Sequence, residues 1–186
     1  RLDVPQDWPS GIYAFHLRTP EGDEDYVPFF VLPPRSGSFA SIGFLAPTFS
    51  YLAYGNAHVE DRFLKEPALK SAFPDAQHLY PSQPQDRYVL EQRLNSSYDL
   101  HSDGSGVAYV SRLLPQVHFR PKVRFQFLHL LKGSPHQFNA DLHIIDWLFA
   151  KGFQHDVLTD EALHLEGADL LKPYRVIITG THPEYW

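Results

Sequence analysis

The chain has 186 residues, enough for one domain or for part of a larger one. Hydrophobic residues make up 43% and charged residues 20%, so the chain can bury a core and is not a disordered tail. A formal charge of -6 argues against nucleic acid or an anionic membrane as a partner. The absence of cysteine excludes disulfides, thiolate metal sites and a cysteine nucleophile. Because the longest apolar runs, 27–34 and 41–47, are too short to span a bilayer, we expect a soluble, cytoplasmic protein.

The two ends of the chain suggest that it belongs to a longer polypeptide. It contains no methionine, not even at its first position, and its start has no apolar core of a signal peptide. Its last residues, 179–186, follow an apolar stretch without a polar tail. We therefore expect an incomplete segment of a larger protein.

The first part of the chain predicts a hairpin followed by a break. Residues 11–18 and 26–32 have the composition of two strands, and the acidic turn between them joins the strands. Residues 33–38 (PPRSGS) are typical of a linker. We accordingly divide the chain into residues 1–38, a hairpin at the end of a β-rich region, and residues 39–186, an α/β core.

The α/β core begins with a short apolar run at 41–46, as expected of a buried parallel strand. Residues 51–124 are rich in Pro, Ser, Asp and aromatic residues and show little periodicity. A long irregular stretch of this kind is typical of loops with a function. Residues 123–131 alternate and then become apolar, which predicts a strand or an extended segment.

The last third predicts helices alternating with strands. Asn139 or Asp141 can cap a helix that ends at Gly152, and a strand follows at 153–158. Thr159 can then cap a second short helix. A final strand at 175–179 completes the order typical of a doubly wound, mostly parallel sheet.

The segment after that final strand is the first candidate site. Ligands of such sheets bind at the carboxyl ends of the strands, where residues 180–185 (GTHPEY) begin. Gly180 and Pro183 would hold a tight loop that points His182 and Glu184 into one crevice. An imidazole and a carboxylate placed in this way suit a metal site or an acid/base pair. An ordinary polar turn is the competing interpretation.

Residues 95–105 (NSSYDLHSDGS) are the second candidate. The Lys-Ser/Thr of a phosphate loop and the acidic spacing of an EF-hand are both missing. His101 and Asp103 could supply metal ligands, although the spacing slightly favours a hydrogen-bonded Asp/Gly turn.

Two tyrosines form the third candidate. Tyr51 and Tyr54 follow the predicted strand at 41–46, although a tyrosine more often packs its ring. The remaining histidines are scattered without a ligand-like cluster, and we interpret them as structural or surface residues. No G-x-S-x-G sequence supports a serine nucleophile.

Taken together, these segments resemble the large (beta) subunits of the N,N-dimethylformamidase family, in order and over nearly the whole chain. The segments that carry the resemblance are residues 9–13 (PSGIY), 25–29 (DYVPF), 46–48 (APT), 53–56 (AYGN), 101–106 (HSDGSG) and 179–186 (TGTHPEYW).

The resemblance implies a fold and a metal site. The fold is an α/β sandwich similar to class I glutamine amidotransferases. The site is a mononuclear iron, Fe3+, held by two tyrosinates and one glutamate, which correspond to Tyr54, Tyr98 and Glu184. His182 would then handle protons beside the metal. Tyr51 is a rival for Tyr54, and Tyr109 is a weaker rival for Tyr98.

The activity implied by the resemblance is hydrolysis of small N-substituted formamides to formate and an amine. Ferric iron favours oxygen donors, and two phenolates with one carboxylate cancel its three charges. The expected partners are a small amide substrate and further copies of the large subunit, with or without a small subunit. One alternative keeps the fold but places iron(II), zinc or manganese among His101, Asp103, His182 and Glu184. Another is a non-catalytic scaffold or carbohydrate-binding relative.

Overall fold

The computed structural model describes residues 2–36, 39–57, 84–125 and 134–185, together with residues 67 and 71. Contacts divide the chain into two compact units. The first unit combines Arg1–Ser50 with Ala140–Trp186, and the second comprises Tyr51–Asn139. Among the described residues, no helix is long and apolar enough to cross a membrane.

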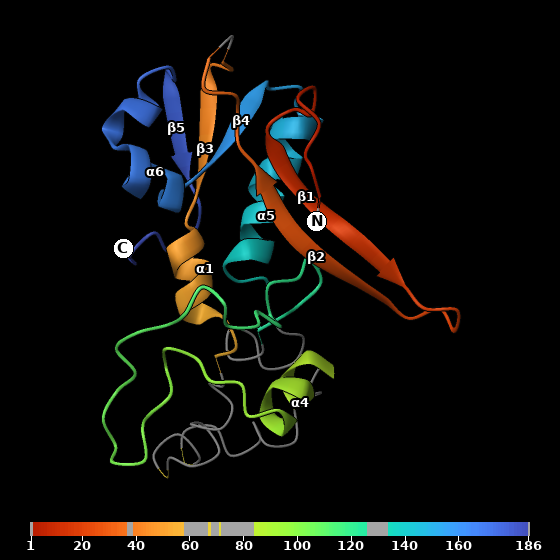
Figure 1. Ribbon diagram of the computed structural model, residues 1–186, viewed down its shortest axis with the longest axis vertical. Coiled ribbons are helices and arrows are strands. Elements are labelled where there is room, and N and C mark those ends of the chain that lie inside the picture. The colour runs from red at the N-terminus through yellow and green to blue at the C-terminus, as the bar shows by residue number, and fades with distance from the viewer. Residues whose placement is uncertain are drawn as a thin grey trace. The chain divides into compact units, whose positions relative to one another are not determined.

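The predicted hairpin is confirmed. Strands β1 (Gly11–Arg18) and β2 (Glu24–Val31) pair antiparallel, from Gly11 opposite Val31 to Arg18 opposite Glu24 (Figure 1). Tyr13 and Phe15 both pack their rings against Phe29 on the neighbouring strand. Such cross-strand aromatic pairs stabilise a two-stranded sheet, which is marginal alone in water.

A three-stranded parallel sheet forms the core of the first unit. Strand β3 (Ile42–Ala46) lies between β4 (His155–Thr159) and β5 (Val176–Thr179), and both pairings are parallel (Figure 1). Phe44, Val157 and Leu158 are almost completely buried. The predicted α/β class and parallel pairing are confirmed in this form: a mixed α/β fold with a three-stranded parallel sheet and an antiparallel hairpin.

The outer edge of β4 is met by a side chain from the segment that leads into the hairpin. The Ser10 hydroxyl accepts a hydrogen bond from the Val157 N–H at 2.6 Å and donates one to the Val157 carbonyl at 3.1 Å. A single hydroxyl thus satisfies both backbone groups that a further strand would pair, which protects an exposed sheet edge.

The helix after β4 forms as its capping residues predict. Helix α6 (Asp160–Glu166) begins after Thr159, whose hydroxyl oxygen accepts a hydrogen bond from the Ala162 N–H at 3.1 Å. Gly167, with a φ of 78°, ends the helix, and the short 3-10 helix η2 (Ala168–Leu171) follows. Glycine is favoured there because a side chain would be strained at this φ.

Helix α5 (Phe138–Ala150) confirms the predicted helix but not its predicted start. Asn139 and Asp141 both lie inside the first turn instead of capping it. The Asp141 carboxylate accepts a hydrogen bond from the Thr181 N–H instead, at 2.7 Å. The Asp141 side chain, which the local sequence predicts as a helix cap, therefore makes a tertiary contact instead.

Two helices lie in regions for which the sequence predicts no regular structure. Helix α1 (Thr48–Tyr54) follows β3, and the Asp160 carboxylate accepts hydrogen bonds from the Thr48 hydroxyl and the Phe49 N–H at its start. Helix α4 (Pro84–Glu91) lies within the stretch of low periodicity. Of the predicted segment 123–131, residues 126–131 lie outside the described part of the chain.

Asp160 makes the stability of the first unit depend on pH. Burial raises the pKa of this carboxyl above its usual 3.8, although the hydrogen bonds from Thr48 and Phe49 act in the opposite direction. A raised pKa in the folded state means that the folded form holds its proton more tightly than the unfolded form. The contribution is therefore fully present below pH 3.8 and is lost as the pH rises through the folded pKa.

We expect Asp160→Asn to remove this pH dependence. From pH 4 to pH 7 the wild type should lose unfolding free energy relative to Asp160→Asn, because only the wild type must ionise a buried carboxyl. Urea denaturation across that range measures the difference. Asp169→Asn is the control, since the Asp169 side chain is 80% exposed and pairs only with the exposed Lys172 among the described ion pairs. A constant difference between wild type and Asp160→Asn would contradict the prediction.

Candidate metal centre

Tyr54 and Tyr98 lie side by side in the second unit. Tyr54 is the last residue of α1, and Tyr98 lies in a turn far along the chain. Their ring centroids are 5.1 Å apart, with the planes tilted by 34°. The hydroxyl of Ser97 donates a hydrogen bond to the Ala53 carbonyl, which ties this turn to the end of the helix. The structure thus brings together the two tyrosines that the resemblance assigns as ligands.

The two residues after Tyr54 hold the end of α1 in place. A Cβ at Gly55 would overlap the end of the Gln116 side chain, which would have to move aside. Asn56 is fully buried with a φ of 57°, a conformation that asparagine tolerates better than most residues. Its side chain donates to the Pro115 carbonyl at 2.6 Å and accepts from the Val117 N–H at 2.9 Å. The Gly-Asn pair of the motif therefore positions Tyr54.

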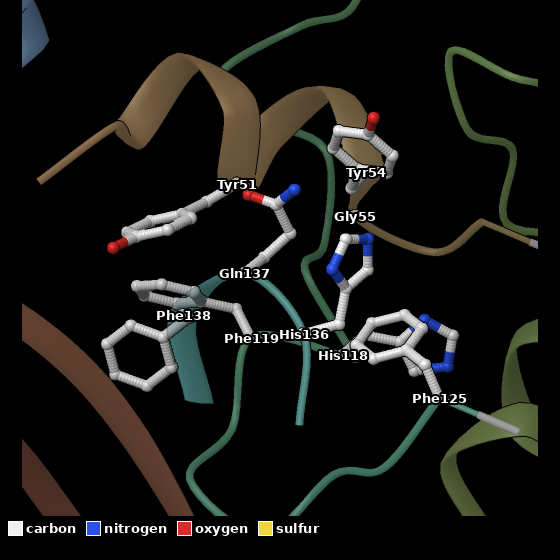
Figure 2. A pocket seen from close by; sticks show the side chains of 9 residues that line it. All are labelled: Tyr51, Tyr54, Gly55, His118, Phe119, Phe125, His136, Gln137 and Phe138. Carbon is white, nitrogen blue, oxygen red and sulfur yellow. The ribbon is translucent and has the colours of Figure 1, made fainter. Parts of the chain in front are cut away.

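A pocket with aromatic walls lies beside the ring of Tyr54 (Figure 2). In this view the Tyr54 hydroxyl points away from His136, whose ring packs edge-on against that of Tyr54 at 5.0 Å. The pocket therefore contacts the ring of Tyr54 on the side away from its phenol oxygen. It is lined by Tyr51, Tyr54, Gly55, His118, Phe119, Phe125, His136, Gln137 and Phe138.

The two rival tyrosines have different surroundings. Tyr51 is 5% exposed, and its ring packs at 5.7 Å from that of Phe119 and at 5.8 Å from that of Phe138. Tyr109 is 94% exposed. The proximity of the rings favours Tyr54 and Tyr98 as a pair, with Tyr51 as part of the aromatic core.

One of the residues that line the pocket, His118, makes a buried hydrogen bond to Asp86 that sequence reasoning missed. His118 Nε2 lies 2.9 Å from Asp86 Oδ1, and both residues are buried. Among the described residues, His118 Nδ1 and the Gln137 amide have no hydrogen-bond partner. The scattered histidines, His118 among them, predict structural or surface residues, and no sequence signal links His118 to an aspartate 32 residues away.

His182 and Glu184 lie in the first unit, at the carboxyl end of β5 as predicted. The Gly180 N–H donates to the Leu45 carbonyl at 3.2 Å, so the chain leaves the sheet directly before them. His182 has a φ of 53°, which is strained for a residue other than glycine. Its Nδ1 lies 3.6 Å from Glu184 Oε1. An imidazole and a carboxylate are therefore adjacent at the sheet edge where ligands bind in this fold class.

His101 and Asp103 form a local turn in the second unit. The Asp103 carboxylate accepts hydrogen bonds from the Ser105 N–H at 2.9 Å and from its hydroxyl at 2.7 Å, and these bonds lower the pKa of Asp103. Both His101 and Asp103 are exposed. Within either unit, the described residues contain no group of three His, Asp or Glu side chains that could hold a metal ion. The turn that competed with the metal interpretation is thus present.

Tyr174 illustrates a tyrosine that is unsuited to act as a phenolate. Burial, and then the neighbouring Asp156 carboxylate, raise its pKa well above the usual value of 10.0. A group with such a pKa keeps its proton near neutral pH.

Comparison with known proteins identifies the family. A family model described as N,N-dimethylformamidase beta subunit-like, C-terminal, matches residues 1–186. The chain is 41% identical, over 99% of its length, to the N,N-dimethylformamidase beta subunit of Paracoccus aminophilus. It is 42% identical, over 98% of its length, to that of an Alcaligenes species. In both cases it spans only 23% of the relative. The chain belongs to the N,N-dimethylformamidase beta subunit-like, C-terminal family.

Proposed function

We propose that this chain is part of an iron-dependent amidohydrolase that converts small N-substituted formamides to formate and an amine. Membership of the family supports an amide substrate, because both relatives are named as subunits of N,N-dimethylformamidase. The observation that carries the proposal is the pairing of Tyr54 with Tyr98 at a ring distance of 5.1 Å. No periodic pattern in the sequence requires Tyr54 and Tyr98, which lie far apart in the chain, to come together.

The donor set fits ferric iron. Two phenolates and the carboxylate of Glu184 are hard, anionic oxygen ligands, and together they balance the charge of Fe3+. Rings as close as those of Tyr54 and Tyr98 allow their oxygens to approach one ion. When bound, ferric iron supplies Lewis acidity, which polarises an amide carbonyl and makes water a stronger nucleophile.

His182 is the residue that we assign to proton transfer. Its Nδ1 lies 3.6 Å from Oε1 of Glu184, the proposed metal ligand. This contact keeps the imidazole beside the carboxylate. Nε2, the ring atom that Glu184 does not engage, would pass a proton to the departing amine nitrogen, because a dialkylamide anion is too basic to leave unprotonated.

The names of the relatives support an enzyme of several subunits. Both are called beta subunits, so we propose that the protein works in an assembly of several copies of the large subunit, with or without a small subunit. The substrate we propose is a small amide, as the names of both relatives suggest.

The experiment that tests this function uses the complete natural polypeptide. We expect about one iron per chain by mass spectrometry, a broad tyrosinate-to-iron band in the visible spectrum, and release of formate and dimethylamine from N,N-dimethylformamide. Iron, zinc or manganese without the band would point to His101, Asp103, His182 and Glu184 instead. A folded protein without metal or hydrolysis would overturn the proposal in favour of a scaffold.

A further inference from the structure

Asp141 is a fully buried carboxylate in the first unit, and it faces the loop that carries His182 and Glu184. It lies in the first turn of α5, yet its Oδ1 accepts a hydrogen bond from the Thr181 N–H at 2.7 Å. A carboxyl oxygen at this distance accepts a well-formed hydrogen bond. The carboxylate is thus fixed to the backbone one residue before His182.

The position of this hydrogen bond marks where the chain leaves the sheet. The Gly180 N–H still bonds to the Leu45 carbonyl of β3, as the last link of the parallel ladder. The next N–H, that of Thr181, bonds to Asp141 instead. His182 then adopts its left-handed conformation, with a φ of 53°. Asp141 therefore accepts a hydrogen bond from the first backbone N–H beyond the sheet, one residue before the strained His182.

Gly180 allows this close approach. A Cβ at Gly180 would overlap the Asp141 carboxylate and would lie 2.5 Å from Pro47 Cδ. Real Cβ atoms do not come so close to a neighbour, so any side chain at residue 180 would push the loop away from Asp141. The glycine of the 180–185 segment is therefore explained by packing against this carboxylate, not by an unusual φ.

We propose that Asp141 is a positioning residue, which holds the 180–184 loop so that His182 and Glu184 take their working geometry. This rests on the proposed function of those two residues. Asp141 acts through the Thr181 backbone and does not itself touch the substrate. Its carboxylate offsets the strain at His182, because the hydrogen bond constrains the residue that immediately precedes it.

The test compares Asp141→Asn with Asp146→Asn in the complete polypeptide. Asp146 lies on the same helix but is exposed, so its variant controls for loss of a charge on α5. In Asp141→Asn we expect hydrogen exchange of the Thr181 amide to accelerate about tenfold, with the β4 and α6 amides unchanged. We expect kcat to fall about 10- to 100-fold, with little change in KM and with iron retained. Asp146→Asn should match the wild type in each measurement.

Gly180→Ala provides a second test that keeps the Asp141 charge. It should accelerate exchange in the same loop and lower kcat in the same way, so the inference stays testable if Asp141→Asn does not fold. Unchanged exchange at Thr181 in either variant, or faster exchange throughout the unit, would overturn the positioning role. The exchange measurement needs neither iron nor activity. A wild type without iron or hydrolysis would therefore refute the proposed function and leave the positioning of the loop to be decided by exchange.

Discussion

Replacing Tyr54 or Tyr98 by phenylalanine in the complete polypeptide should abolish the tyrosinate-to-iron band and lower the bound iron to well below one per chain. Each substitution removes one anionic oxygen donor and keeps the ring, so the packing of the two rings at 5.1 Å is preserved. Hydrolysis should fall about a thousandfold or more, because the polarisation of the carbonyl and the activation of water both depend on the metal. Metal analysis, the visible spectrum and kcat/KM for N,N-dimethylformamide measure the three effects.

Two matched variants control for the loss of a tyrosine hydroxyl. Tyr109→Phe removes one from a residue that is 94% exposed and should leave iron and activity unchanged. Tyr51→Phe removes one within the aromatic core, where the ring packs against Phe119 and Phe138, and should retain the band. Loss of the band in Tyr51→Phe but not in Tyr54→Phe would reassign the ligand. Retention of metal in both Tyr54→Phe and Tyr98→Phe would exclude a tyrosinate site.

The first unit could be predicted from sequence because its signals are local. Thr159 and Gly167 lie at the two ends of α6, and the apolar runs of β3 and β5 are short and bounded by turn residues. Each signal acts within a few residues of its effect, so a single sequence is enough. Even here the predicted cap of α5 is wrong, because the Asp141 carboxylate accepts a hydrogen bond from the distant Thr181 N–H.

The second unit could not be predicted because its contacts connect distant residues. Asn56 bonds to residues 115 and 117, far along the chain, and the Ser97 hydroxyl bonds to the Ala53 carbonyl of α1. In α4, only Asp86 and Val89 are buried, so no apolar stripe reveals the helix. The periodicity of hydrophobic residues therefore predicts little of the structure of this unit.

The candidate site residues also divide into those that local sequence could place and those that it could not. The position of His182 and Glu184 follows from the sheet, since the carboxyl end of a parallel strand is where ligands bind. The pairing of Tyr54 with Tyr98 has no periodic signal and was indicated only by resemblance to a family. The buried pair of His118 and Asp86 had neither kind of signal and became visible only in the structure.

His182→Asn should separate proton transfer from metal binding. Asparagine tolerates a positive φ better than most residues, so the backbone at 53° can be kept while the titrating ring is lost. We expect iron and the visible band to stay as in the wild type, because the tyrosines and Glu184 remain. The kcat for N,N-dimethylformamide should fall about 100- to 10,000-fold, the usual effect of removing a general acid.

The substrate series and the control make this result specific. A departing amine that is a weaker base needs less help from a proton donor. His182→Asn should therefore lose less activity on a formamide of such an amine. His143→Asn changes an exposed histidine on α5 and should behave as the wild type. If His182→Asn lost iron together with activity, the imidazole would belong to the metal site, as the His101, Asp103, His182 and Glu184 alternative requires. An equal loss on both substrates with iron retained would instead assign His182 to the placement of Glu184, which lies 3.6 Å from its ring.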